Sequence, residues 1–502
     1  MDYQIPEKVR RVVIMGGGSA GLIAALTLKL RLPEMDVEVV HSTELGIIGV
    51  GEGTTAAFPR HFFEYLKLNP AGFYAEAEPT WKLGIHFLWG PHPQGFNYTF
   101  HNEYKSRWPD MTRNTGFYCD AQTRWTGLIS ACMAKDKVFP RRPEGGGPHF
   151  HKNHAFHIEN EKLVHYLSAE CIKVGVTFVD GIVERVEKNL YGVAALHLKA
   201  GRAVTADLFV DASGFRSELI GKTLEEDFLS FEKSLFCDRA VIAGWPRTRE
   251  VIKPYTVAET MDCGWCWQIE HENWINRGYV YSSGFISDDD ALAEFRQKNP
   301  RIANTPRVVK FRSGRYRRHW VGNVVGIGNS VGFVEPLEAT ALQVICIETS
   351  TLADTLRDSL GGPNQPLVDL YNRYNIRQWD ELRDFLAVHY KFNTRLDTPF
   401  WRACREDTDL VEAEEVVRFY RANGPSAVAE SVMFDPNNSF GLEGYLAMLI
   451  GQGVPHAKPY SPPPSEARLW NERLSNYGQL AANGYSVADC LALIRSGKVK
   501  LG

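Results

Sequence analysis

The chain has 502 residues, and its 56 Lys and Arg residues nearly balance its 60 Asp and Glu residues, for a formal net charge of −4. That balance leaves no global field to attract nucleic acid or an anionic membrane surface, so we expect neither as a partner. Hydrophobic residues make up 44% and charged residues 23%, which is typical of a globular protein with two to four domains. The first residues lack the apolar segment of a signal peptide, and no run of about 18 apolar residues occurs, so we expect a cytoplasmic location.

A glycine-rich turn follows the first apolar run. Residues 12–15 read VVIM, as in a buried parallel strand, and the residues after the turn favour a helix. The glycines have the G-x-G-x-x-G spacing that lets the backbone approach a dinucleotide pyrophosphate at a helix N-terminus; an ordinary tight turn is the alternative. The predicted cofactor contacts in this turn are Gly16, Gly18, Ser19, Ala20 and Gly21.

Residues 37–40 predict a second strand, which completes a βαβ entry to a nucleotide-binding domain. An acidic residue is expected about 20 positions after the glycines to bind the ribose hydroxyls, but His41 occupies that place. A neutral imidazole accepts such a hydrogen bond more weakly than a carboxylate does, so we expect weaker or reversible cofactor binding through His41.

A second glycine-rich segment, residues 46–55, reads GIIGVGEGTT. It is too apolar for an ordinary solvent loop, so it indicates backbone approach to a flat ring or a phosphate, with a packed turn as the alternative. The candidate cofactor contacts in this segment are Gly49, Gly51, Glu52 and Gly53.

Lys82 stands alone in an aromatic and apolar setting, EPTWKLGI over residues 78–85. A lone lysine in such a place is more often a surface residue with a buried stem than a catalytic group, so the local sequence favours the ordinary interpretation.

Histidine and cysteine patterns suggest metal or redox chemistry only weakly. Five histidines fall within residues 149–165, but no cysteine or acidic residue completes a ligand set, so polar histidines around a loop and a strand are favoured. Cys263 and Cys266 form the one C-x-x-C pair among nine scattered cysteines, which indicates reduced thiols and no metal site.

Two later strands also end in turns that suit a nucleotide. Residues 206–214, ADLFVDASG, run into a turn after Asp211, like the second strand and turn that some flavoproteins bring toward FAD. Residues 323–330, NVVGIGNS, repeat the design, with Asn329 where flavoprotein hydroxylases commonly have Asp. Beyond them, apolar residues at spacings of three and four predict helices over 339–360 and 366–392, and weaker helices to about residue 495.

Four stretches together resemble one family, the flavin-dependent halogenases of the tryptophan-halogenase type. They are GGGSAG followed by GVGEGT, Trp81-Lys82, GWCWQIE at 264–270, and EPLEATAL at 335–342 with TRLDTPFW at 394–401. The third matches the family's W-x-W-x-I-P except at its last position and is the most specific, because related monooxygenases lack it. The resemblance extends from about residue 10 to about residue 495.

The resemblance implies an α/β fold, with an FAD-binding Rossmann-like core of the flavoprotein monooxygenase type. We expect residues 1–390 to form this core with inserted substrate-side segments, and residues 391–502 to form a helical region packed on it. Besides the glycine turns and His41, the cofactor contacts expected by resemblance are Val183, Asp211, Asn329 and Leu342.

The resemblance also implies a division of labour. Reduced FAD and O₂ convert chloride or bromide to hypohalous acid, which Lys82 directs to an electron-rich aromatic, either as an ammonium that hydrogen-bonds the hypohalous oxygen or as a neutral amine that forms a haloamine. Glu338 then stabilises the cationic ring or takes its proton. The backbone amides of Thr340 and Ala341 match the halide site. Trp265 and Trp267 separate the flavin from the substrate, so that oxygen is not inserted directly.

Two departures from the family pattern concern the substrate side. Glu270 replaces the motif's proline, which removes a rigid φ and adds a charge. Ala339 replaces the serine of several tryptophan-specific members, and their clamps for a free amino acid are not evident, so an indole is expected while pyrroles and phenols stay open.

No second nucleotide fingerprint for NAD(P)H occurs, which indicates a separate flavin reductase. A single-component FAD-dependent aromatic hydroxylase is the alternative enzyme, although it would have no use for the tryptophan pair. A non-catalytic flavin-binding protein is the remaining class, in which Lys82 and Glu338 would be replaceable without chemical consequence.

Overall fold

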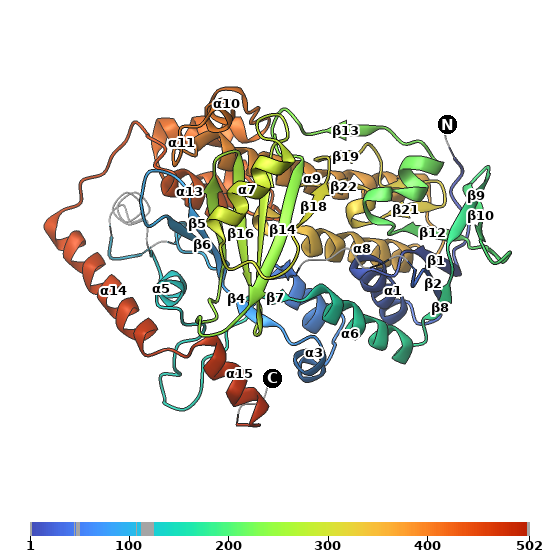
Figure 1. The fold of residues 1–502 in the computed structure, drawn as a ribbon, viewed down its shortest axis with the longest axis horizontal. Coiled ribbons are helices and arrows are strands. Elements are labelled where there is room, and N and C mark those ends of the chain that lie inside the picture. Colours follow the sequence, from blue (N-terminus) through green and yellow to red (C-terminus); the bar gives the residue numbers. More distant parts are fainter. Residues whose placement is uncertain (1–2, 45, 47–50, 107, 112–124, 499–502) are drawn as a thin grey trace. The chain divides into compact units, whose positions relative to one another are not determined.

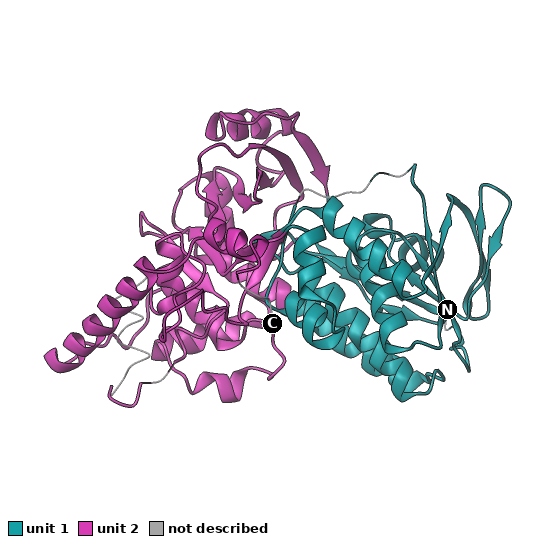
Figure 2. Cartoon of the chain, turned by 90° about the horizontal axis from the view of Figure 1, so that it is seen from below, with its two compact units in different colours: residues 1–78, 158–231, 311–380 teal, residues 79–157, 232–310, 381–502 magenta. Residues whose placement is uncertain are grey.

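The computed structural model describes residues 3–44, 46, 51–106, 108–111 and 125–498 (Figure 1). The chain forms two compact units, each assembled from three separate segments (Figure 2). Unit 1 comprises residues 1–78, 158–231 and 311–380, and unit 2 comprises residues 79–157, 232–310 and 381–502. In the described part of the chain, no helix is both long and apolar enough to span a membrane.

Unit 1 is organised around a six-stranded sheet. Its strands lie in the order β20 (Trp320–Val321), β21 (Val324–Gly326), β12 (Leu208–Asp211), β1 (Arg11–Met15), β2 (Asp36–His41) and β8 (Thr177–Asp180). All neighbours are parallel except β20 and β21. Val12, Val13 and Ile14 fill the middle of β1 with no exposure, as a strand covered on both faces requires. The predicted α/β core with parallel strands is confirmed.

Helices surround this sheet. α1 (Ser19–Arg31) packs against both α6 (Asn160–Lys173) and α8 (Ala341–Asp358). All eight residues of α1 from Gly21 to Leu28 are buried, because the helix is enclosed rather than amphipathic. The other helices of the unit are α2 (Ala57–Pro59), η1 (Arg60–Tyr65), α3 (Pro70–Glu76) and the first part of α9 (Gln365–Phe392).

Two small sheets and several short turns complete unit 1. One sheet joins β9 (Val183–Asn189), β10 (Gly192–Leu198) and β11 (Ala203–Val204), and the other joins β13 (Phe228–Ser230), β19 (Gly314–Tyr316) and β22 (Gly332–Phe333). The short elements are β3 (Glu52–Gly53), η2 (Gly214–Arg216), η3 (Glu218–Thr223), η4 (Gly328–Ser330) and η5 (Pro336–Glu338).

Unit 2 contains a seven-stranded, mainly antiparallel sheet. Its order is β18 (Arg307–Lys310), β14 (Arg239–Pro246), β17 (Trp274–Tyr281), β16 (Gly264–Glu270), β15 (Thr256–Met261), β5 (Gly84–Leu88) and β6 (Phe96–Thr99). α7 (Asp288–Lys298) packs on one face of it through a core that includes Cys266, Tyr279 and Phe295. Separately, β4 (Thr80–Lys82) pairs with β7 (Ala155–Ile158).

The remaining elements of unit 2 are helices. They are α5 (Leu128–Ala134), α10 (Pro399–Asp407), α11 (Ala413–Asn423), α12 (Ala429–Met433), α13 (Gly441–Gly451), α14 (Pro464–Ala482) and α15 (Val487–Arg495). The expectation of a helical C-terminal part is therefore confirmed. The division of the chain into domains at residue 390 stays a prediction.

Candidate active site

The first glycine turn has the geometry that a pyrophosphate needs. Gly16 has φ +130°, and a Cβ there would lie 2.3 Å from the carbonyl oxygen of Ala212. A Cβ on Gly21 would lie 1.9 Å from the carbonyl oxygen of Gly16, so these two positions admit only glycine. A Cβ on Gly18, in contrast, would meet nothing within 4 Å. The middle glycine thus borders open space, as expected where a ligand approaches the backbone.

The N-terminus of α1 is prepared for an anion. Gly18 precedes the helix without a side-chain cap, and the first turn carries no acidic residue. Its first amide groups therefore keep their donors for a ligand. The Ser19 hydroxyl donates to Asn160 Oδ1 at 2.6 Å, which joins the start of α1 to α6. Ala20 lies close to the η4 turn, since a Cβ on Gly328 would be 3.5 Å from the Ala20 Cβ.

His41 ends β2 directly beside this turn. A Cβ on Gly17 would lie 2.7 Å from the His41 Cβ, so the histidine packs against the glycine segment. Its ring meets Phe178 edge-on, with centroids 5.8 Å apart. The position is the one where a ribose partner is expected, which keeps the proposed hydrogen bond to the cofactor sterically reasonable.

The second glycine-rich segment is described from residue 51 onward, so Gly49 lies outside the described residues. Gly51 has φ +85°, and Glu52 and Gly53 form β3. Burial raises the pKa of Glu52 to about 7. Its carboxyl group is therefore close to half protonated at neutral pH and can donate as well as accept a hydrogen bond.

Asp211 is fully buried at the end of β12, and its carboxylate is hydrogen-bonded to the residues that follow the strand. Its carboxylate accepts from the backbone N–H and hydroxyl of Ser213 at 3.0 and 2.6 Å, and from the N–H groups of Leu219 and Ile220 at 2.7 and 3.0 Å. Desolvation nevertheless raises the pKa of Asp211. The carboxylate holds the loop after β12 in shape, and its predicted contact with the cofactor stays a prediction.

A buried carboxylate that the sequence did not reveal supports the turn after β21. Glu348 on α8 accepts the N–H of Gly328 at 2.7 Å and the indole N–H of Trp379 at 3.1 Å. Its side chain is fully buried. Asn329, the next residue of this turn, is half-buried. The signal was an acidic residue on the apolar face of a helix, three positions after Ile345, where a leucine or valine is expected.

The start of α8 brings together the proposed base and the proposed halide site. Glu338 ends η5 and is 4% exposed, and Ala339 then turns the chain with φ +55°. Thr340 precedes the 18-residue helix without a side-chain cap, and the first turn, from Ala341, has no acidic residue. An anion at these amides would be favoured by the helix dipole. Leu342 is buried one residue further on.

Lys82 ends β4 and is fully buried. It lies opposite Ala155 of β7, and its Nζ is 5.5 Å from the centre of the Phe100 ring. The ordinary interpretation of a surface lysine is therefore wrong, because burial depends on tertiary contacts that the local sequence does not show. Lysine is almost never buried so completely unless its charged group is paired.

The tryptophan pair lies on β16. Trp265 and Trp267 are 1% and 5% exposed, and their rings are 5.9 Å apart at 54°. Gly278 on β17 lies opposite Trp267, and a Cβ there would come within 1.9 Å of the indole. The glycine thus provides the space in which the Trp267 indole rests on the neighbouring strand.

The histidine and cysteine patterns contribute no obvious chemistry. Burial lowers the pKa of His151 to about 3 and that of His154 to about 4, so both are neutral. Burial raises the pKa of Cys263 and Cys266 to about 11, which disfavours thiolates. No group of three His, Cys, Asp or Glu side chains among the described residues could hold a metal ion.

The predicted site residues divide between the two units. Unit 2 holds Lys82, Trp265 and Trp267. Unit 1 holds the glycine turns, Glu338, the start of α8 and Val183, which is half-buried at the start of β9. That Lys82 and Glu338 share one cavity stays a prediction.

Comparison with known proteins gives a consistent result. The family model described as tryptophan halogenase matches residues 11–463. Tryptophan 7-halogenase RebH of Lentzea aerocolonigenes is 30% identical over 498 residues, 92% of each chain. Tryptophan 6-halogenase ThaL of Streptomyces albogriseolus is 32% identical over 446 residues, 83% of each chain.

Solved structures agree over nearly the whole chain. The structure of MibH, a lanthipeptide tryptophan 5-halogenase, has a TM-score of 0.88 at 36% identity and covers 98% of this chain and 94% of its own. BrvH, a flavin-dependent halogenase from Brevundimonas sp. BAL3, has a TM-score of 0.84 at 30% identity and covers 97% of this chain and 99% of its own. This chain therefore belongs to the tryptophan halogenase family of flavin-dependent enzymes.

Proposed function

We propose that this protein halogenates an indole ring with chloride or bromide, using O₂ and reduced FAD from a separate NAD(P)H-dependent flavin reductase. The observation that carries the proposal is Lys82, a fully buried lysine in the unit that also holds the tryptophan pair. The names of the relatives, which are halogenases of tryptophan at positions 5, 6 and 7, support an indole as the ring.

The residues of unit 1 fit the cofactor and the halide. The open space at Gly18 and the uncapped start of α1 suit the FAD pyrophosphate. When bound, reduced FAD with O₂ supplies the oxidising equivalents that convert the halide to hypohalous acid. The amides of Thr340 and Ala341, at the uncapped start of α8, would hold the halide beforehand.

Lys82 would act on the oxidant. The centre of the Phe100 ring lies 5.5 Å from its Nζ, and the face of that ring would attract Lys82 in its ammonium form. The ammonium donates a proton toward the oxygen of the hypohalous acid, which makes the halogen more electrophilic. The indole then attacks the halogen, the carbon–halogen bond forms as the oxygen–halogen bond breaks, and the oxygen leaves as water.

Glu338 would act on the ring afterwards. The halogenated ring is a cation until it loses the proton from the attacked carbon. A buried carboxylate stabilises that cation electrostatically and accepts the proton, which restores aromaticity. Trp265 and Trp267 would keep the flavin away from the indole, so that the ring meets only the halogen oxidant.

Product analysis tests this function. The protein is incubated with FAD, an NADH-driven flavin reductase, O₂, bromide or chloride, and either indole, free tryptophan or a tryptophan-containing peptide. Mass spectrometry should show a halogenated product that depends on the halide and on the reductase. A hydroxylated product without any halogenated one would contradict the proposal and support the aromatic hydroxylase.

A further inference from the structure

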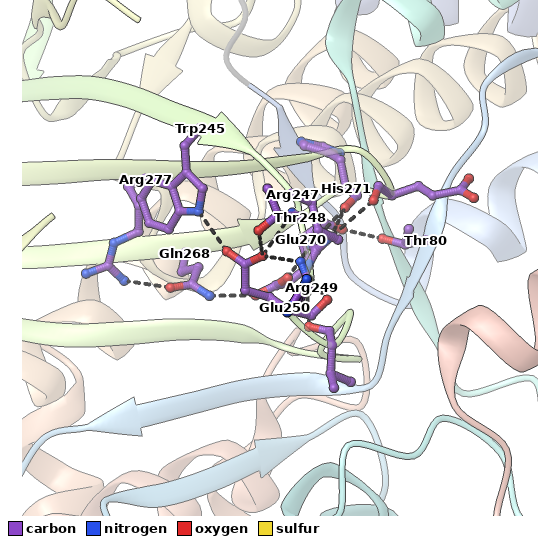
Figure 3. A network of polar contacts seen from close by, with 12 residues as sticks. Thr80, Trp245, Arg247, Thr248, Arg249, Glu250, Gln268, Glu270, His271 and Arg277 are labelled. Carbon is purple, nitrogen blue, oxygen red and sulfur yellow. Dashed lines mark hydrogen bonds and ion pairs between the residues drawn. The ribbon is translucent and has the colours of Figure 1, made fainter. Parts of the chain in front are cut away.

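The turn between β16 and β17 is held from inside by one arginine (Figure 3). The Arg247 Nε donates to the carbonyl oxygens of His271 and Glu272, each at 3.1 Å. Its Nη2 donates to the His271 carbonyl at 2.8 Å and to the Glu270 carboxylate at 2.5 Å. The side chains of Arg247 and Glu270 are 7% and 1% exposed, so this ion pair is excluded from water.

Arg247 also contacts the loop of residues 248–251. The Nη1 of Arg247 donates to the carbonyl oxygens of Glu250 and Val251 at 3.3 and 3.1 Å. The Glu250 carboxylate accepts the N–H groups of Thr248 and Arg249, which preforms this loop and holds the pKa of Glu250 well below its usual range. The planar guanidinium therefore uses all its nitrogens, which a lysine could not reproduce.

The other oxygen of Glu270 continues the network along the sheet. It accepts from Gln268 Nε2 at 2.6 Å, and Gln268 Oε1 accepts from Arg277 at 3.2 Å. Because side chains alternate along a strand, Gln268 and Glu270 lie on the face of β16 opposite Trp265 and Trp267. The network thus holds the strand that carries the tryptophan pair from the other face of the sheet.

The same turn also contacts the strand that carries Lys82. The hydroxyl of Thr80 donates to the carbonyl oxygen of Glu270 at 2.5 Å (Figure 3). Thr80 is fully buried on β4, two residues before Lys82 and on the same face of the strand. Opposite Thr80 lies His157, whose pKa burial lowers, with the Lys82 charge as a further cause, so it is neutral.

We propose that the Arg247–Glu270 pair and the Thr80 hydroxyl are positioning residues that set the place of Lys82 relative to the tryptophan pair. The pair fixes the Glu270 carbonyl, and the Thr80 hydroxyl transmits that position to β4. A glutamate at 270, where the family motif has proline, makes the buried ion pair possible. The inference rests on the proposed role of Lys82. A displaced lysine would still be present but would capture the oxidant less often.

The test measures how each enzyme turnover is divided. In the full chain supplied with reductase, FAD, bromide and indole, bromoindole is measured against free hypobromous acid collected by a diffusible trap. Thr80→Val keeps the side-chain shape but removes the donor, so the ratio of bromoindole to free oxidant should fall about tenfold, with little change in the rate at which O₂ consumes FADH₂. Thr80→Ser keeps the donor and should restore the ratio. Glu270→Gln and Arg247→Lys should also lower the ratio of bromoindole to free oxidant.

A matched control separates positioning from stability. Ser234 is also buried in unit 2, and its hydroxyl donates to the carbonyl oxygen of Asp409 at 2.7 Å. Ser234→Ala should lower the melting temperature as Thr80→Val does but leave the product ratio unchanged. Equal ratios for Thr80→Val and the parent, or equal decreases for Thr80→Val and Ser234→Ala, would overturn the inference. If Thr80→Val does not fold, Glu270→Gln decides by the same ratio.

Lys82→Ala, measured beside these variants, shows which proposal fails. A parent that makes no bromoindole, or a Lys82→Ala variant that makes as much as the parent, contradicts the proposed function. A parent that requires Lys82 but is indifferent to Thr80, Arg247 and Glu270 contradicts this inference alone.

Discussion

The two units provide the proposed site residues in different ways. Unit 1 offers backbone groups, namely a glycine turn bordering open space at Gly18 and the uncapped starts of α1 and α8. Unit 2 offers buried charged side chains, Lys82 and the Arg247–Glu270 pair. Backbone amides bind an anion wherever the chain is correctly turned, whereas a buried charge depends on every partner around it. Substitutions in unit 1 should therefore mainly change the affinity for FAD or halide. Substitutions in unit 2 should change the rate of halogenation and the share of hypohalous acid that reaches the indole.

The largest effect should follow from removing the unit 2 lysine. Lys82→Ala should lower halogenation by about 10³-fold or more, because no other group is proposed to direct the oxidant. FADH₂ oxidation and release of free hypohalous acid should continue, since the glycine turn of unit 1 is untouched. Product and free oxidant are quantified in the same reaction. Lys82→Arg, which keeps the charge but not the amine, should rescue little. Halogenation by Lys82→Ala at the parent rate would end the assignment.

Glu338 is the exception in unit 1, because there a side chain is assigned chemistry. Glu338→Gln keeps the shape but loses the anion, so turnover should fall by about 10²-fold while the KM for halide stays within a fewfold range. Steady-state kinetics with bromide and indole measure both quantities. If Glu338→Gln raised the KM for halide without lowering turnover, the carboxylate would belong to the halide site rather than to the ring chemistry.

The same contrast explains what the sequence could predict. The glycine turn was predictable because each glycine follows from local geometry: Gly16 from its φ, and Gly21 from the approach of a carbonyl oxygen five residues away. The helices of 341–358 and 365–392 also followed, within a few residues, from the spacing of their apolar positions. Features that are fixed by residues close in sequence can therefore be predicted from the sequence.

The unit 2 features depend on residues far apart. Thr80 contacts Glu270 across 190 positions, and Arg247 pairs with Glu270 across 23, so neither contact has a local pattern. Family resemblance singled out Lys82 and the unusual Glu270, but it could not show what surrounds them. The sequence indicated neither the full burial of Lys82 nor the pairing of its strand β4 with β7.

A smaller effect should follow from closing the open space in unit 1. Gly18→Asp adds a side chain where a Cβ would meet nothing within 4 Å, so the fold should tolerate it. Its carboxylate would face the pyrophosphate, and the affinity for FAD should fall about tenfold or more through like-charge repulsion. Flavin fluorescence titration measures the affinity. Gly72→Asp on α3, where a Cβ would likewise meet nothing, is the matched control and should leave the affinity unchanged. Unchanged affinity in Gly18→Asp would contradict the placement of the pyrophosphate.

The smallest effect should concern stability alone, at a second buried acid of unit 2. Glu443 on α13 is 7% exposed, and its carboxylate accepts the N–H groups of Glu103, Tyr104 and Lys105 at 2.8, 3.0 and 3.0 Å. Burial raises the pKa of Glu443 from its ordinary 4.5 to about 7, with the nearby Glu103 adding to the increase. This carboxyl group latches α13 to the chain after β6.

The direction of the pH dependence follows from the raised pKa. Below pH 4.5 the Glu443 carboxyl group is protonated in both the folded and the unfolded chain, so it does not lower the free energy of unfolding. Between pH 4.5 and about 7 the unfolded chain ionises first, and the free energy of unfolding decreases; above pH 7 the loss is complete. A pKa shift of this size lowers the free energy of unfolding by at most about 3 kcal/mol. From pH 5 to pH 8, the free energy of unfolding of the parent should fall by up to about 2.5 kcal/mol more than that of Glu443→Gln, which cannot ionise. Urea denaturation at the two pH values measures the difference, and Glu414→Gln, an exposed glutamate on α11, should behave as the parent does. Equal pH dependence in the parent and in Glu443→Gln would show that this buried acid, unlike the charges around Lys82, is held at no cost.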